Sequence, residues 1–406
     1  MFKLRDYQVD ISKKGVEILT KHNFLYLAVE VRCGKTFISL DIAKNMNFKN
    51  VLFITKKKAI SSIEKDYATI GKPFNILVIN YESIHKIPDT KWDLIILDEA
   101  HCLGAFPKPS KRAKQVKALI KKSSVILLSG SPTPESYSQM YHQVYGIPNN
   151  PFAGFTNFYK FARKYVNVKQ SYVNGFMAND YKDGLETIID KMVPYTISFT
   201  QEESGFKSKI NEHFLECQMK PSTYALIEKL RKDLVVEGKE EVILADTGVK
   251  LMSKIHQLCS GTVKFESGNA MVIDDSKALF IKEQFKGQKI GIFYKFTTEL
   301  KALKEVFGDS LCTELEEFDT TNKSIALQIV SGREGVSLRN AESLVYYNIC
   351  HSATSYWQSR DRLTYKERKE NDIYWIFSKG GIESKIYKSV SKKKNYTLSH
   401  FKKDFI

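Results

Sequence analysis

The stretch FLYLAVEVRCGKTFISL, residues Phe24–Leu40, places an apolar strand, a short loop and a helix-like run in direct succession. The strand-like part ends at Val29, and the loop ends in Gly34-Lys35-Thr36. Glycine lets the backbone approach a ligand closely, and the free N–H groups at a helix N-terminus attract phosphate oxygens. Lys35 supplies a positive charge, and Thr36 supplies a hydroxyl that can bind Mg²⁺. The stretch therefore predicts a loop that binds the phosphates of ATP. The residues expected to contact the nucleotide here are Arg32, Cys33, Gly34, Lys35 and Thr36.

This phosphate loop departs from the strict pattern G-x-x-x-x-G-K-[ST], because Val29 stands where the first glycine is expected. The tripeptide Gly34-Lys35-Thr36 is a weak signal when taken alone, and its alternative interpretation is a chance match at a turn. The order of strand, loop and helix around the tripeptide favours the phosphate loop.

A second apolar run, Leu94–Leu97, ends in Asp98-Glu99-Ala100-His101. Paired carboxylates at the end of a buried strand are costly unless a cation or a reacting water uses them. Asp98 is therefore expected to lie on the Mg²⁺ side, and Glu99 is expected to orient and deprotonate the attacking water. The alternative is an ordinary turn with solvated acids. Two elements of an ATP site in the right order favour the catalytic interpretation.

Short apolar runs alternate with helix-like stretches in the first third of the chain and again near the C-terminus. Continuous apolar strands separated by helices are typical of a parallel sheet covered on both faces. The sequence therefore predicts an α/β protein with a first lobe over residues 1–148, a helical insertion and linker over 149–275, and a second lobe over 276–406. The expected strands are Phe24–Val29, Val51–Thr55, Ile76–Asn80, Asp93–Leu97, Val125–Ser129, Ile290–Tyr294, Ser324–Val330, Ser343–Asn348 and Asp372–Phe377, and the middle segment is expected to hold helices at Ser222–Val236 and Thr247–Cys259.

The composition favours a polyanionic partner, because 62 Lys and Arg against 46 Asp and Glu give a net charge of +16. Solvated surface lysines are the alternative explanation. The six cysteines form no C-x-x-C pair, so neither a zinc site nor a disulfide framework is indicated. The sequence holds no apolar run long enough to cross a bilayer and no apolar leader. We expect a soluble cytoplasmic protein, in the host cytoplasm if it is viral, and a monomer.

Asp98-Glu99-Ala100-His101 resembles the motif that names the DEAH-type ATPases of superfamily 2. Further segments, from Leu4 to about Phe401, are similar to the other motifs of that superfamily and follow its order. The resemblance implies two RecA-like lobes of the P-loop NTPase type, with ATP and Mg²⁺ as cofactors. The similar segments are Leu4–Gln8 for the Q motif, Phe53–Lys57 for motif Ia, Asn80–Ser83 for motif Ib, Leu128–Pro134 for motif III, Ile292–Phe296 for motif IV, Ser331–Leu338 for motif V and Gln358–Arg362 for motif VI.

The resemblance also implies roles for residues outside the phosphate loop. Gln8 is expected to read the adenine base, and Gly335 to contact the nucleotide. Arg362 is expected to deliver a guanidinium to the γ-phosphate as an arginine finger. The family places a second arginine three residues later, but Tyr365 stands there. Lys366 and Arg368 are the candidate substitutes.

Nucleic-acid contacts in this superfamily run chiefly through phosphates. By resemblance, the expected contacts are Thr55, Lys56, Lys57, Ser131 and Ser331.

The layout of motifs V and VI is closest to the Swi/Snf-like branch, since Gly335–Leu338 is followed by Ala341-Glu342, Trp357-Gln358 and Asp361-Arg362. This resemblance implies an ATP-dependent motor that moves along DNA, with duplex favoured over single-stranded DNA, in replication, recombination or repair. Strand unwinding stays open, as does an RNA-directed helicase. A non-enzymatic alternative is a nucleic-acid-binding protein that keeps the fold and has lost ATP turnover.

Overall fold

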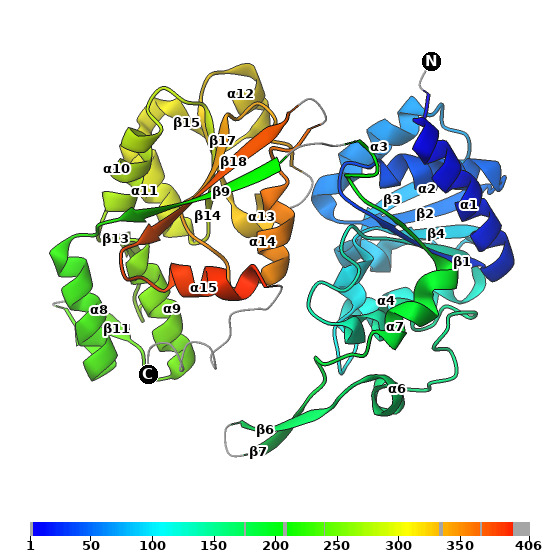
Figure 1. Cartoon of the computed structure of the whole chain (residues 1–406), viewed down its shortest axis with the longest axis horizontal. Helices are drawn as coiled ribbons and strands as arrows, with labels where there is room; N and C mark the ends of the chain where they lie inside the picture. Colours follow the sequence, from blue (N-terminus) through cyan, green and yellow to red (C-terminus); the bar gives the residue numbers. More distant parts are fainter. Residues whose placement is uncertain are drawn as a thin grey trace. The chain divides into compact units, whose positions relative to one another are not determined.

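The computed structural model describes residues 3–173, 176–205, 209–238, 240–332, 336–365 and 368–392. The chain divides into two compact units, Met1–Phe206 and Lys207–Ile406 (Figure 1). Each unit is built on a six-stranded sheet in which all described strand pairs are parallel. The predicted α/β class with two RecA-like lobes is therefore confirmed.

The sheet of the first unit has the strand order β3-β2-β4-β5-β1-β8. Its strands are continuous apolar runs because the sheet is covered on both faces. The strand before the phosphate loop and the strand before the carboxylates are separated by one strand, so their carboxyl ends lie near each other at one edge. The strands are β1 (Phe24–Val29), β2 (Asn50–Thr55), β3 (Asn75–Asn80), β4 (Leu94–Leu97), β5 (Ser124–Leu128) and β8 (Thr196–Phe199).

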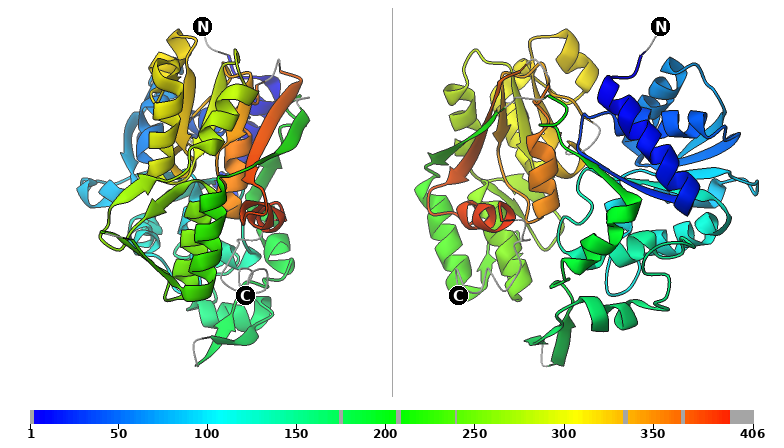
Figure 2. Two further views of the ribbon diagram at one scale, coloured as in Figure 1. Left: turned by 90° about the vertical axis from the view of Figure 1, so that its left-hand side faces the viewer. Right: turned by 45° about the vertical axis from the view of Figure 1, so that its right-hand side comes forward.

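Helices pack on both faces of this sheet (Figure 2). Successive side chains of a strand point to opposite faces, so Leu25 and Leu27 join one apolar cluster, whereas Phe24 and Tyr26 join the other. The first cluster is covered by α1 (Asp6–His22), α2 (Lys35–Asn45) and α3 (Ile60–Thr69). The second cluster is covered by α4 (Lys111–Leu119), α5 (Met140–Val144), α6 (Phe158–Tyr165) and α7 (Thr187–Met192).

The sheet of the second unit has the strand order β15-β16-β14-β17-β18-β9 and is again covered on both faces. Its strands are β9 (Lys209–Cys217), β14 (Ile290–Tyr294), β15 (Leu311–Cys312), β16 (Ser324–Gln328), β17 (Ser343–Tyr346) and β18 (Glu370–Ser378). The helices are α8 (Pro221–Asp233), α9 (Gly248–Cys259), α10 (Ser276–Gln284), α11 (Thr297–Phe307), α12 (Leu315–Thr320), α13 (Ile329–Gly332), α14 (Ala353–Arg360) and α15 (Glu383–Val390).

The segment 149–275 contains helices α6 to α9, two of them close to the expected ranges, and several short strands. It also completes both sheets, because β8 pairs with β1 in the first unit and β9 pairs with β18 in the second. The division of the chain at residues 206 and 207 therefore differs from the boundaries expected at 148 and 275. Among the described residues, no helix has the length and apolar character needed to span a membrane.

Candidate nucleotide-binding site

The phosphate loop connects the end of β1 to the start of α2. Gly34 is the N-cap residue of α2 and has a φ of +79°, in the left-handed region that favours glycine. A side chain at this position would also overlap Nε2 of Gln8. Both constraints explain why the turn into the helix needs glycine, and they leave Lys35 as the first residue of α2.

The start of α1 holds this loop from one side. The phenol of Tyr7 donates to the carbonyl oxygen of Cys33 at 3.3 Å, and Nε2 of Gln8 donates to the same oxygen at 3.4 Å. Oε1 of Gln8 accepts from the backbone N–H of Arg5 at 2.9 Å. Gln8 thus positions the phosphate loop in this structure, and its expected contact with adenine stays a prediction.

The segment after β8 holds the loop from the other side. The backbone N–H of Gln201 donates to Oε2 of Glu30 at 2.8 Å, and its side-chain amide donates to the carbonyl of Val31 at 3.0 Å. The thiol of Cys33 is buried beside Ser204, and burial raises its pKa above the ordinary value. Cys33 therefore stays a neutral thiol at neutral pH and offers the loop its backbone. Gln201 and Ser204 were not anticipated from sequence.

The two carboxylates predicted from sequence follow β4 directly. Glu99 has a φ of +50°, a conformation that is rare outside glycine and that clusters at functional sites. Its Oε1 lies 3.6 Å from Nζ of Lys35, so the structure brings together the predicted phosphate-binding lysine and the predicted base. Asp98 is buried, which excludes the alternative of two solvated acids at a turn.

Asp98 is held by its neighbours on only one carboxylate oxygen. The hydroxyl of Thr55 donates to Oδ2 at 2.8 Å, whereas Oδ1 is buried and has no hydrogen-bond partner among the described residues. Burial and the nearby charge of Glu99 raise the pKa of Asp98 to about 6, against the opposing effect of Lys35. A buried, unpartnered carboxylate oxygen fits Mg²⁺, which binds through one or two carboxylates together with substrate phosphates. Asp98 and Thr36 are the residues that would hold the ion.

His101 connects the carboxylate of Glu99 to the segment after β5. Its Nδ1 lies 3.3 Å from Oε2 of Glu99 and 3.0 Å from Oγ of Ser129. Ser129 in turn accepts from the backbone N–H of Ser131 at 3.2 Å. A change in the position of Glu99 can therefore be transmitted through two side chains to the loop that carries Ser131.

The same loop is anchored by a residue that no sequence motif singles out. Gln143 on α5 donates from Nε2 to the carbonyl of Pro132 at 2.8 Å and accepts from the hydroxyl of Tyr26 at 2.7 Å. Tyr26 belongs to β1, so the loop is tied to the strand that leads into the phosphate loop.

The residues predicted to contact nucleic acid differ in their solvent exposure. Lys57 is exposed, and Lys56 and Ser131 are half-buried. Thr55 requires a correction, because its side chain is fully buried and its hydroxyl is used by Asp98. In the second unit, the hydroxyl of Ser331 donates to the carbonyl of Gln328 at 3.1 Å.

Arg362 is buried within the second unit. Its guanidinium donates to the carbonyl of Gln358 at 3.0 Å and to the carbonyl of Val336 at 3.1 Å. Arg368, a candidate for the missing second arginine, donates to the carbonyls of Ala341 and Glu342. The structure thus shows Arg362 bonded to the backbone of its own unit, and its role as a finger stays a prediction. Gly335 and Lys366 lie outside the described residues.

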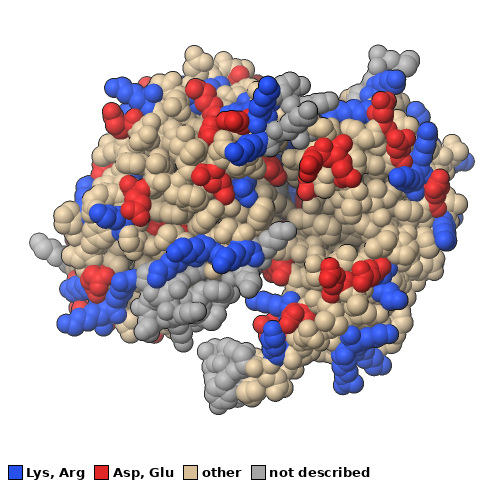
Figure 3. All heavy atoms as spheres, viewed as in Figure 1, with Lys and Arg blue, Asp and Glu red and all other residues tan. Residues whose placement is uncertain are grey.

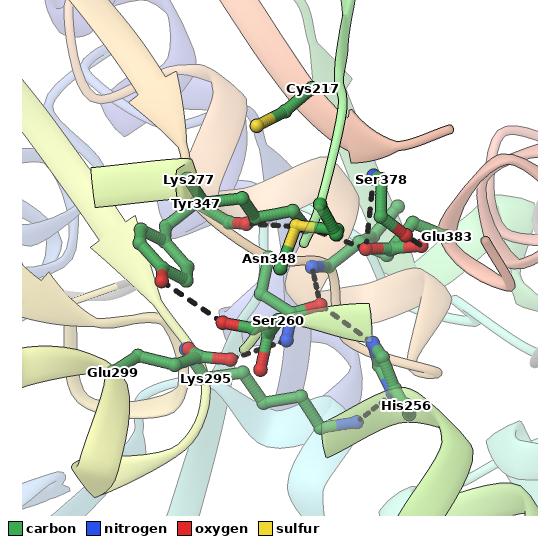
Figure 4. A network of polar contacts seen from close by, with 12 residues as sticks. Cys217, His256, Ser260, Lys277, Lys295, Glu299, Tyr347, Asn348, Ser378 and Glu383 are labelled. Atoms are coloured by element: carbon green, nitrogen blue, oxygen red, sulfur yellow. Dashed lines mark hydrogen bonds and ion pairs between the residues drawn. The ribbon is translucent and has the colours of Figure 1, made fainter. Parts of the chain in front are cut away.

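The segment that resembles motif IV ends in a buried polar network (Figure 4). Nζ of Lys295 lies 2.9 Å from Nδ1 of His256, whose Nε2 lies 2.6 Å from Oδ1 of Asn348. Glu299 accepts from the backbone N–H groups of Lys295 and Phe296 and from the Asn348 amide. Burial lowers the pKa of His256 and Lys295 and raises the pKa of Glu299. The network therefore links α9 and the start of α11 to the segments that directly follow β14 and β17.

The raised pKa of Asp98 predicts a stability effect that depends on pH. Folding raises this pKa from 3.8 to about 6, so the folded state binds the proton more tightly, and the parent loses stability through this group as pH rises across that window. Asp98→Asn avoids this loss. At pH 8, without Mg²⁺ and ATP, its free energy of unfolding is expected to be about 1–3 kcal/mol higher than that of the parent. The difference should vanish near pH 4. Urea unfolding at a series of pH values measures it, and an Asn variant less stable than the parent at pH 8 would contradict it.

Comparisons with known proteins give a family match and a match among solved structures. The family model described as the SNF2-related domain matches residues 39–260, more than half of the chain. Among solved structures, the chain is similar to the SWI2/SNF2 ATPase core of Sulfolobus solfataricus, solved in complex with double-stranded DNA. The identity is 16% and the TM-score 0.45, over 99% of this chain and 92% of that one. No curated protein matches the chain at a significant level. On the extent of the family match, the chain belongs to the SNF2-related domain family.

Proposed function

We propose that this protein is a nucleic-acid-stimulated ATPase that converts ATP hydrolysis into movement along DNA, with duplex DNA as the preferred track. The observation that carries the proposal is the cluster of Lys35, Asp98 and Glu99 at the carboxyl edge of the first sheet. In α/β proteins with open parallel sheets, ligands bind beyond the carboxyl ends of the strands. Membership of the SNF2-related domain family supports the same activity.

In the proposed reaction, water attacks the γ-phosphorus of ATP, the bond to the bridging oxygen breaks, and ADP and inorganic phosphate leave. Lys35 holds the phosphate oxygens, and the N–H groups at the start of α2 add donors. Mg²⁺ held by Asp98 and Thr36 would neutralise charge on the phosphates. Glu99 orients the water and accepts its proton.

Hydrolysis changes the hydrogen-bonding demand on Glu99, and His101 lies beside it. The contacts from His101 through Ser129 to the N–H of Ser131 offer a route from the reacting phosphate to a predicted nucleic-acid contact. Arg362 is proposed to complete the site as a finger once its bonds to backbone carbonyls are released. Movement along DNA would then follow the nucleotide state.

Phosphate release measured without nucleic acid and with duplex DNA, single-stranded DNA or RNA tests the proposal. The expected result is weak basal hydrolysis and the strongest stimulation by duplex DNA. Absence of hydrolysis under every condition would favour a binding protein without turnover. Stimulation by RNA alone would favour an RNA-directed enzyme, and release of a paired strand would favour unwinding over translocation.

A further inference from the structure

One stretch of the first unit is strongly basic and contains no acid. Residues Ala100–Pro134 hold seven Lys and Arg and no Asp or Glu, although 46 of the 406 residues of the chain are acidic. On the face shown in Figure 3, basic side chains lie among acidic ones over much of the surface. The net charge therefore does not by itself mark a binding face, and a stretch free of acids is a more specific signal.

The basic residues of this stretch are concentrated on α4 and the short helix η4 (Ile120–Lys122) that continues it. One side of α4 is buried through Ala113 and Val116, and Ser110 caps the helix by accepting from the N–H of Ala113 at 3.1 Å. The opposite side carries exposed lysines. The α4 basic face consists of Lys108, Lys111, Lys114, Lys121 and Lys122, all of them exposed.

Two further basic side chains of α4 make contacts within the protein. Arg112 pairs with Oε1 of Glu82 at 2.6 Å and lies over the ring of Tyr81, 5.1 Å from its centroid. Nζ of Lys117 lies 3.5 Å from the ring centroid of Tyr145. These contacts fix the orientation of α4, so the lysines of its basic face project from a rigid element.

The charge pattern of α4 opposes the stability of the helix itself. The first turn contains no acidic residue and begins with Lys111 and Arg112, although cations are unfavourable near a helix N-terminus. Lys111 and Lys114 are three residues apart, a spacing at which like charges repel. Among the described residues, the only ion pair that α4 forms is that of Arg112 with Glu82. A bound polyanion would compensate this unfavourable arrangement.

We propose that the α4 basic face binds the phosphate backbone of duplex DNA, in addition to the contacts expected from Lys56, Lys57 and Ser131. The twelve residues from Lys111 to Lys122 span a rise of about 16 Å at the helical spacing. Duplex DNA carries one negative charge per about 1.7 Å of its axis, so such a row faces several phosphates. This inference rests on the proposed function.

Contact at α4 also has a structural route to the catalytic carboxylate. Arg112 lies over Tyr81, and the hydroxyl of Tyr81 donates to the carbonyl oxygen of Asp98 at 2.7 Å. DNA bound along α4 would therefore contact the helix whose Arg112 lies over Tyr81, and Tyr81 is hydrogen-bonded to the backbone of Asp98. We expect the α4 basic face to affect DNA-stimulated turnover as well as DNA affinity.

The test compares two triple variants of the full chain. Lys111→Gln, Lys114→Gln and Lys121→Gln remove three charges from the α4 basic face. The matched control, Lys13→Gln, Lys14→Gln and Lys21→Gln, removes three exposed lysines from α1. Binding of a labelled duplex DNA is measured from about 50 to 200 mM NaCl, where each lost phosphate contact makes the slope of log Kd against log salt shallower by about 0.9.

The α4 variant is expected to show a slope shallower by up to about 2.7, a Kd at least tenfold higher, and unchanged ATPase activity without DNA. The α1 control should change the slope by less than about 1. Equal effects of both variants would overturn the α4 assignment. It would also be overturned if the α4 variant bound duplex DNA like the parent and lost affinity only for an RNA duplex. A parent that binds no duplex DNA would instead overturn the proposed function.

Thermal unfolding separates a binding role from a purely structural one. Removing repelling lysines from the first turn of α4 is expected to leave the melting temperature unchanged or to raise it. If the α4 variant bound DNA weakly because its fold was damaged, the melting temperature and the basal ATPase activity would both fall below those of the α1 control, and the inference would be withdrawn.

Discussion

Glu99→Gln is expected to lower DNA-stimulated ATP turnover by about 10²–10⁴-fold, the usual contribution of a general base. The amide keeps the size of the side chain and can still contact Lys35 and His101, but it cannot accept the proton of the attacking water. Binding of ATP should therefore stay within a few-fold of the parent. Single-turnover hydrolysis and equilibrium binding of a fluorescent ATP analogue measure the two effects separately.

The control for this variant is Glu64→Gln, which makes the same substitution at an exposed position of α3 in the same unit. Its turnover should match the parent. Loss of ATP binding together with turnover in Glu99→Gln would show that the ion pair with Lys35 mainly shapes the phosphate loop. Turnover near the parental level would remove Glu99 from the role of base.

The central strands of both sheets could be predicted from the sequence because each is buried on both faces and reads as a continuous apolar run. The predicted ranges Phe24–Val29 and Ile290–Tyr294 coincide with β1 and β14. The edge strand β9 gave no such signal, because its residues Lys209–Cys217 mix polar and apolar side chains without a continuous apolar run, and most of them are partly exposed. Edge strand β8 is only four residues long, so its pattern is too short to distinguish it from a loop.

The candidate site shows a similar limit. Lys35, Asp98 and Glu99 could be selected because each follows a recognisable strand within a few residues. The residues that hold these side chains and the phosphate loop come from distant segments: Thr55 contacts Asp98 across 43 positions, and Gln201 contacts Glu30 across 171. No local pattern marks such residues, since their role depends on how the strands are ordered in the sheet. The assignment of Thr55 to nucleic acid failed for this reason.

Motif resemblance also places a residue without showing its contacts. Lys295 belongs to the predicted motif IV segment, but its position beside His256 depends on α9, which lies in the segment expected as an insertion. A half-buried lysine beside a buried histidine is costly unless both are hydrogen-bonded, which the network of Figure 4 provides. Helix α9 is thus an integral part of the second unit, and its His256 belongs to the polar network there.

Lys35→Ala is expected to reduce DNA-stimulated ATP turnover on the order of 10³-fold, because the γ-phosphate loses the cation that offsets its developing charge. The substitution should also weaken Mg²⁺ binding, so half-maximal turnover at neutral pH should need a higher Mg²⁺ concentration. Lys35 opposes the rise in the pKa of Asp98, so its loss raises that pKa further and leaves Asp98 more often protonated. Affinity for duplex DNA should stay within about threefold of the parent, since neutralising a lysine weakens DNA binding only where it contacts phosphates.

Lys44→Ala, at the exposed end of the same helix, is the matched control and should retain parental turnover. Phosphate release at a series of Mg²⁺ concentrations measures the effect, and full activity of Lys35→Ala would refute the phosphate-loop assignment on which the proposed function rests.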